Sequence, residues 1–80
     1  MDKKIAVVAI IVNDKDAVSK INELLHTFGE YIIGRMGIPY REKNLNVISV
    51  VMDATQEVIN SLSGKLGMIK GVSSKVLTTK

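Results

Sequence analysis

The chain has 80 residues, a formal net charge of +3 and no cysteine. A chain of this length makes one small domain, which buries only about 60% of the surface that its unfolded form exposes. Because cysteine is absent, disulfides and thiolate metal sites are excluded, and packing and association remain as sources of stability. We therefore expect residues 1–80 to form a single domain.

The apolar run 5–12 is the only long candidate for a membrane span. It has eight residues, whereas a helix needs about 20 to cross a bilayer. The polar residues 13–16 follow it directly, without the small-residue cleavage pattern of a signal peptide. We expect a cytoplasmic protein with no membrane partner.

Charge argues against a nucleic-acid partner. The eleven basic residues are scattered among eight acidic ones, and no basic stripe is present that would follow a phosphate backbone. The sequence therefore predicts no tight DNA or RNA binding.

Hydrophobic periodicity predicts a strand and then a helix in the first part of the chain. Residues 5–12 form a continuous apolar run rich in β-branched side chains, which is typical of a buried strand. Asp14 and Asp16 lie in the turn that follows, where we interpret them as N-capping residues. Apolar residues then recur at helical spacing: Ala17, Ile21, Leu24, Leu25 and Phe28. Gly29 occupies the position of a left-handed C-cap.

The remainder predicts two strands, a helix and a final strand. The second strand covers residues 31–38 and is bounded by Pro39, with a polar hairpin tip at 41–44 and a third strand at 45–52. Asp53 and Gln56 have capping-box spacing. The second helix carries an apolar stripe and is stopped by Gly67: Val58, Ile59, Leu62 and Leu66. Gly71 opens the last strand, 72–79.

An internal repeat supports this order. A shift of 38 residues equates seven pairs of identical or similar residues: Ile10 with Ile48, Val12 with Val50, Ile21 with Ile59, Asn22 with Asn60, Leu24 with Leu62, Phe28 with Leu66, and Gly29 with Gly67. Two such βαβ halves make an α+β, ferredoxin-like βαββαβ sandwich. Right-handed crossovers give an antiparallel four-stranded sheet in the order 4-1-3-2, with two helices on one face.

The two central strands are apolar on both faces, although helices can cover only one. The residues left on the uncovered face are Val7, Ala9, Ile11, Val47, Ser49 and Val51. An apolar patch of this kind marks an interface. We predict a homodimer or homotetramer through this face, with edge-strand pairing as the alternative. Polar residues on the edge strands, Arg35, Ser73 and Lys75, are expected to form its rim.

No catalytic constellation is apparent. His26 is the only histidine and lies off the apolar stripe of its helix, so we expect a solvated residue and no metal site. Other uses of this fold require cysteine pairs for copper, aromatics on the central strands for RNA, or an anion-binding arginine in the first turn. None of these is present, and a regulatory use, as in amino-acid-sensing ACT domains, remains. We predict no enzyme and no cofactor.

One segment is unusual for a strand because it contains two glycines, Gly34 and Gly37. Glycines in a strand leave room for a ligand or another backbone to approach closely. The candidate ligand-binding or partner-binding residues are Gly34, Arg35, Met36, Gly37 and Tyr40. A twisted edge strand leading into a hairpin is the competing interpretation.

The segment 34–40, the strand 47–51 and the stretch 62–67 followed by Gly71 and Val72 together resemble the iron-only hydrogenase system regulator family. The resemblance covers essentially the whole chain. It implies an ACT-like domain similar to the C-terminal domain of the nickel-responsive repressor. The metal-binding histidines and cysteine of that repressor are missing here, as is the glycine of typical ACT effector loops. Because the first predicted strand starts by about Lys4, we also expect no N-terminal ribbon-helix-helix segment.

We therefore expect an ACT-like regulatory module linked to the iron-only hydrogenase system, with a small-molecule effector or a protein partner. If it regulates transcription, it is not expected to bind DNA tightly by itself. The alternative is a structural adaptor that holds other proteins together and senses no small molecule.

Overall fold

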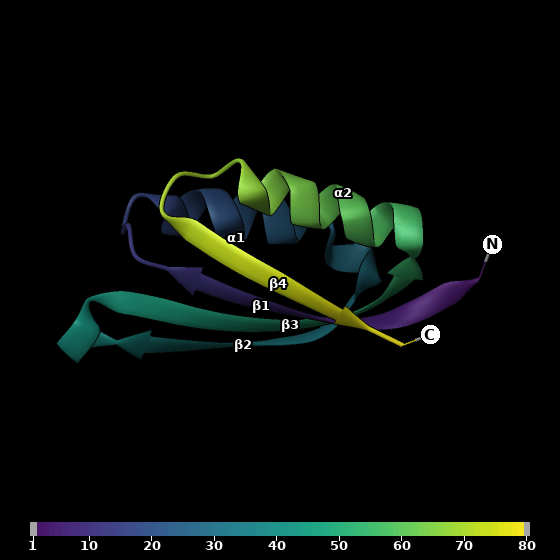
Figure 1. Cartoon of the computed structure of the whole chain (residues 1–80), viewed down its shortest axis with the longest axis horizontal. Coiled ribbons are helices and arrows are strands. Elements are labelled where there is room, and N and C mark those ends of the chain that lie inside the picture. Colours follow the sequence, from purple (N-terminus) through teal and green to yellow (C-terminus); the bar gives the residue numbers. More distant parts are fainter. Residues whose placement is uncertain (1, 80) are drawn as a thin grey trace.

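The computed structural model describes residues 2–79 and confirms the predicted α+β fold. An antiparallel sheet carries two helices on one face (Figure 1). The elements are β1 (Lys3–Val12), α1 (Ala17–Thr27), η1 (Gly29–Tyr31), β2 (Ile32–Tyr40), η2 (Arg41–Lys43), β3 (Leu45–Thr55), α2 (Gln56–Gly67) and β4 (Val72–Thr78). The strand order β2-β3-β1-β4 is the predicted order 4-1-3-2 read from the opposite edge.

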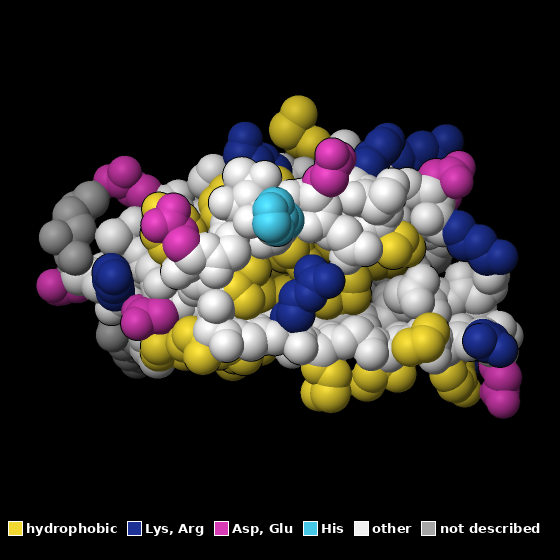
Figure 2. All heavy atoms as spheres, turned by 180° about the vertical axis from the view of Figure 1, so that it is seen from behind, with side chains coloured by type: hydrophobic (Ala, Val, Ile, Leu, Met, Phe, Trp, Pro, Cys, Tyr) yellow, Lys and Arg dark blue, Asp and Glu magenta, His cyan; other side chains and the backbone are white. Residues whose placement is uncertain are grey.

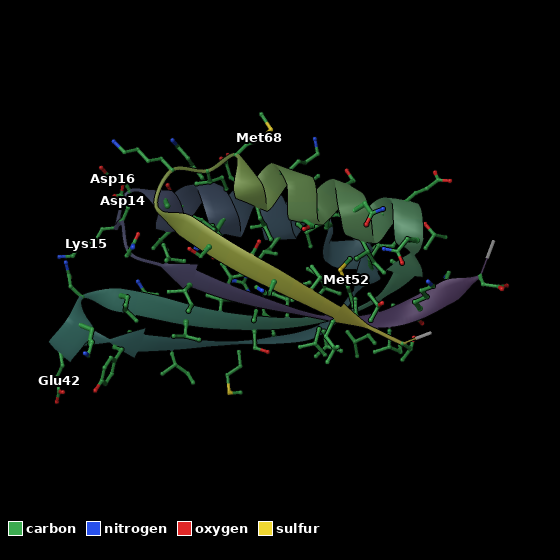
Figure 3. The ribbon with its side chains drawn as sticks, in the orientation of Figure 1. Asp14, Lys15, Asp16, Glu42, Met52 and Met68 are labelled. Carbon is green, nitrogen blue, oxygen red and sulfur yellow. The ribbon has the colours of Figure 1, made fainter. Side chains whose placement is uncertain are left out.

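The central pair β1 and β3 separates the two faces of the sheet. Val8 pairs with Val50 and Ile10 with Ile48, and these four side chains are between 0 and 9% exposed beneath the helices. Their sequence neighbours point to the opposite face, because successive strand residues alternate. Figure 3 shows Met52 pointing into the layer between sheet and helices, whereas Met68 points away from the molecule.

The core fills this layer with apolar side chains from both helices and from the helix-facing side of the sheet. Its buried members are Ala6, Val8, Ile10, Val12, Ala17, Ile21, Leu25, Phe28, Ile48, Val50, Met52, Ala54, Ile59, Leu62 and Leu66. Among residues 2–79, no helix is long and apolar enough to cross a membrane.

The internal repeat corresponds to a symmetry of this core. Ile10 and Ile48, which the 38-residue shift equates, are direct partners across β1 and β3. Ile21 in α1 and Ile59 in α2 are likewise both buried. The repeat therefore marks equivalent core positions in the two βαβ halves.

Gly29 differs from its prediction as a left-handed C-cap. Helix α1 is capped by Phe28, whose backbone N–H donates to the carbonyl of Leu24 at 3.1 Å. Gly29 then begins the short 3₁₀ turn η1, and Gly71 is the described glycine with positive φ. The chain continues here in a right-handed turn, so no left-handed residue is needed.

Strand β2 is displaced from its predicted bounds. Tyr31 belongs to η1, and the strand continues through Pro39 to Tyr40. Proline is tolerated because β2 is an edge strand, where an N–H donor can be missing without breaking the ladder. The polar tip at 41–44 forms the turn η2, and Asn44 closes it in the left-handed conformation with φ of 55°.

The start of α2 also differs from prediction. Strand β3 runs to Thr55, which carries Asp53 into the strand as an exposed residue opposite Ile5. Thr55 is the N-cap, and its hydroxyl accepts a hydrogen bond from the backbone N–H of Val58 at 3.4 Å. The predicted capping role of Asp53 is therefore wrong.

The acidic turn before α1 has a different role from the predicted one. Asp16 occupies the N-cap position but makes no side-chain capping hydrogen bond. Asp14 Oδ1 instead accepts from the backbone N–H of Asp16 at 3.0 Å, which is an Asx turn. Figure 3 shows both side chains, with Lys15, at the turn that joins β1 to α1.

Candidate functional site

The candidate binding residues of β2 are divided between the two faces of the sheet. Gly34, Met36 and Tyr40 lie opposite Val51, Ser49 and Leu45, on the face away from the helices. Arg35 and Gly37 lie opposite Val50 and Ile48, on the helix side. The five residues therefore contribute to two separate surfaces.

The first surface is the sheet face opposite the helices, called the open face below. The six predicted interface residues lie there as three direct cross-strand pairs: Val7 with Val51, Ala9 with Ser49, and Ile11 with Val47. Val7 is 38% and Ile11 46% exposed, although both lie on a central strand. The open face is therefore apolar at its centre, and no element within residues 2–79 covers it.

Apolar side chains continue the open face onto both edge strands. Ile38 lies beside Val47 and Met36 beside Ser49, while Leu77 lies beside Val7. All three are more than half exposed. The predicted interface does not include Ile38 or Leu77, although the alternation along residues 34–40 indicates that Ile38 lies on this face.

The predicted polar rim is correct in position for two of its three residues. Ser73 and Lys75 lie on β4 opposite Ile11 and Ala9, at the edge of the open face. Arg35 lies on the other face of the sheet, because its cross-strand partner is the buried Val50. The prediction that Arg35 borders the open face is therefore wrong.

The second surface is a groove of about 280 Å³ between α1 and β2, called the α1–β2 groove below. It is lined by Val18, Asn22, Arg35, Gly37, Ile38, Pro39, Asn46 and Ile48. Arg35 crosses from the edge strand to the helix, where its guanidinium donates to Asn22 Oδ1 at 3.2 Å. Figure 2 shows this side of the molecule, with a basic side chain lying over hydrophobic side chains in the hollow between the two layers.

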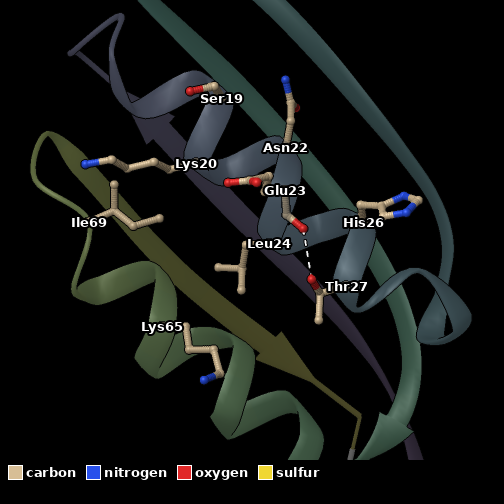
Figure 4. A pocket seen from close by; sticks show the side chains of 9 residues that line it. All are labelled: Ser19, Lys20, Asn22, Glu23, Leu24, His26, Thr27, Lys65 and Ile69. Atoms are coloured by element: carbon tan, nitrogen blue, oxygen red, sulfur yellow. Dashed lines mark hydrogen bonds between the residues drawn. The ribbon is translucent and has the colours of Figure 1, made fainter.

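The third surface is a hollow between the two helices, on the outer side of the molecule (Figure 4). Leu24 and Ile69 supply its apolar part, and Lys20, Glu23 and Lys65 supply charges of both signs. The hydroxyl of Thr27 donates to the carbonyl of Glu23 at 3.1 Å, within the same helix. This hollow is open, of mixed charge, and contains no convergent polar groups that select one ligand.

Reactive side chains do not converge in the described part of the chain. His26 is an exposed residue of α1, and residues 2–79 contain no cluster of three histidine, cysteine or carboxylate side chains that could hold a metal ion. The surfaces that this fold builds are an apolar sheet face and a groove with an arginine. Both are suited to binding.

Comparison with known proteins gives one family and several similar folds. Residues 4–76 match the family described as "TM1266-like: Iron-only hydrogenase system regulator, putative". The structure of the uncharacterized protein TM1266 from Thermotoga maritima is 40% identical, with a TM-score of 0.94, and the alignment covers 99% of this chain and 100% of that one. No curated protein matches the sequence significantly.

Two more distant structures share the fold. One is described as a "putative PII-like signaling protein" from Thermus thermophilus, with 17% identity, a TM-score of 0.69, and coverage of 99% of this chain and 90% of that one. The other is CPII, a nitrogen regulatory PII-like protein from Thiomonas intermedia, with 13% identity, a TM-score of 0.54 and full coverage of both chains.

Proposed function

Because this chain belongs to the iron-only hydrogenase system regulator family, we propose that it is a small non-catalytic regulatory module. It acts by associating with other chains and by binding a small effector or a protein partner. The family membership confirms the resemblance carried by the segment 34–40. A cytoplasmic location is part of the same proposal.

The observation that carries this proposal is the apolar open face. Ile11 and Met36 are 46% and 62% exposed on it, and burying an aliphatic side chain of this size contributes about 1.5–3 kcal/mol. A domain of this size has a total stability of about 5–10 kcal/mol. Covering several such side chains would therefore change its stability substantially.

A second copy of the chain is the partner that this face fits best. Ala9 and Ser49 are small and lie at its centre, and larger aliphatic residues surround them. Small central side chains let two sheets approach closely while their neighbours interdigitate. We therefore infer a homodimer or homotetramer with sheet-to-sheet contact.

Effector sensing separates a regulator from an adaptor, which is the alternative function. An effector that binds the native state must raise the melting temperature, whereas an adaptor without a ligand responds to none. CPII, which has a similar fold, is described as bound to ADP, AMP and bicarbonate. These compounds are therefore included in the ligand screen that follows.

A thermal-shift screen of amino acids, nucleotides, bicarbonate and divalent metals tests the sensing form of the proposal. We expect at least one class to raise the melting temperature in a saturable manner. If every compound leaves the melting temperature unchanged, the sensing function is wrong and the adaptor is favoured.

A further inference from the structure

Arg35 is the one charged residue that lines the α1–β2 groove. Its guanidinium donates a hydrogen bond to the neutral side-chain amide of Asn22, on α1, at 3.2 Å. A guanidinium carries five N–H donors in a fixed fork, so this single neutral contact leaves most of them available. The hydrogen bond to α1 holds the charged group over the groove, so that less conformational entropy is lost when a ligand binds.

The charged side chains that line the groove and the two hollows beside it are basic. The lining of the groove contains Arg35 and no aspartate or glutamate. A second hollow lies next to the groove on the side of the hairpin tip. Pro39 and Asn46 line both, and Lys15 and Arg41 line the second hollow as well. In the other direction, the neighbouring hollow shares Asn22 and Arg35 and adds His26. All three linings are therefore free of carboxylates, which favours an anionic ligand.

The rest of the groove can accept an apolar group. Val18 of α1 and Ile48 of β3 line it together with Pro39, and the amides of Asn22 and Asn46 add hydrogen-bonding groups. Small-molecule sites combine apolar walls with a few placed polar groups in this way. A ligand with a charged head and an apolar body matches this lining.

Gly37 keeps the groove open beside Arg35. A β-carbon at Gly37 would have no heavy atom within 4 Å, so the space above this residue is unfilled. Its φ is not positive, so no backbone strain requires glycine there. The missing side chain instead lets a ligand approach the strand.

We propose that the α1–β2 groove binds a small organic anion. Its carboxylate or phosphate monoester contacts the guanidinium of Arg35, and its apolar body lies against Val18 and Ile48. The inference rests on the sensing form of the proposed function and assigns its site. It places the effector on the helix side of the edge strand, away from the apolar open face.

Nuclear magnetic resonance of the ¹⁵N-labelled chain tests this site with three probes of similar shape. Phenyl phosphate and benzoate carry the two anionic heads, and benzamide is the uncharged control. We expect saturable shift changes at the amides of Asn22, Arg35 and Gly37 with at least one anion, and none with benzamide. The two anions distinguish a phosphate effector from a carboxylate effector.

Matched variants identify the residues responsible. Arg35→Gln should weaken anion binding at least tenfold, because a charge-assisted contact is lost, whereas Lys70→Gln, at an exposed position of the turn after α2, should leave it unchanged. Gly37→Leu should block the groove, whereas Gly64→Leu, at an exposed position of α2 outside the groove, should not. A β-carbon at Gly64 also has no heavy atom within 4 Å, so the comparison of the two leucine variants reports on the position of the side chain and not on steric overlap.

Three results would overturn the site: silence to both anions, equal binding by Arg35→Gln, or shift changes confined to another surface. Binding elsewhere would leave effector sensing intact. Silence would remove only this groove, and the thermal-shift screen would then decide the proposed function independently.

Discussion

Gly71 packs directly against Asp14, so that a β-carbon on the glycine would overlap Cβ of the aspartate. Gly71 also has a φ of +82°, and its carbonyl accepts a hydrogen bond from the backbone N–H of Asn13 at 3.0 Å. The turn between β1 and α1 and the turn before β4 are thereby held together. Both the left-handed backbone and the close approach require glycine at this position.

Replacement of Gly71 by alanine should destabilise the protein by about 1–3 kcal/mol, because a strained backbone and a steric overlap act together. Gly64→Ala is the control, since a β-carbon there has no heavy atom within 4 Å and Gly64 lies inside α2. Alanine is the better helix former by about 1 kcal/mol, so this variant should be more stable than wild type. Urea unfolding at fixed protein concentration measures both, and equal stability of the two variants would contradict the packing described above.

The N-cap of α2 gives a second prediction. Thr55→Ala should cost about 1 kcal/mol of unfolding free energy, because it removes the hydroxyl that accepts from Val58. Thr55→Ser keeps an oxygen in the same place and should retain most of the stability. Asp53→Ala should be nearly neutral, since Asp53 is an exposed strand residue. If Asp53→Ala lowers the free energy of unfolding more than Thr55→Ala does, Asp53 and not Thr55 caps the helix.

Association through the open face is tested by introducing charged side chains into it. The double variant Val47→Lys with Val51→Lys should be monomeric or unfolded, because two lysines cannot be buried between apolar sheets without partners. Ser19→Lys with Ser61→Lys adds the same charge at exposed helix positions and should keep the wild-type oligomer. Sedimentation equilibrium reads the mass of each.

Two outcomes would change this interpretation of the open face. An oligomer that survives both lysines in a folded chain favours edge-to-edge pairing through β2 or β4. A wild-type monomer at high micromolar concentration excludes self-association altogether.

DNA binding by the purified protein should be weak and unspecific. Its eleven basic and eight acidic residues are interleaved, so we expect a dissociation constant no tighter than about 10⁻⁴–10⁻⁶ M at physiological salt. Electrophoretic mobility shift with the promoter regions of the hydrogenase genes measures it. An operator-specific complex in the nanomolar range would mean that this chain reads DNA itself.

Sequence periodicity determined much of the fold. The apolar run 5–12, the helical stripe that begins at Ala17 and the 38-residue repeat each depend on local spacing, and the structure contains the corresponding elements. The family was also recognisable from short segments such as 34–40. Patterns of this kind persist without tertiary information because each element must present one apolar side to the core.

Tertiary pairing decided where strands end and which residue caps a helix. Asp53 has the right spacing for a capping box, but the pairing of β1 with β3 continues to Lys3 and Thr55. That pairing holds Asp53 in an extended conformation and moves the cap by two residues. Nothing local to Asp53 contains this information, because its partner Ile5 is distant in sequence.

The position of Arg35 depended on a single irregularity in the sheet. Ile32 pairs with Met52 and Gly34 with Val51, so β2 has one residue more than β3 at this point. Such a bulge reverses the alternation of faces along the strand. Counting from the half-buried Ile32 would place Arg35 on the open face, whereas the bulge turns it toward α1 and forms the groove. The sequence determined that an arginine lies between two glycines. Only the pairing of β2 with β3 decided on which face of the sheet its side chain lies.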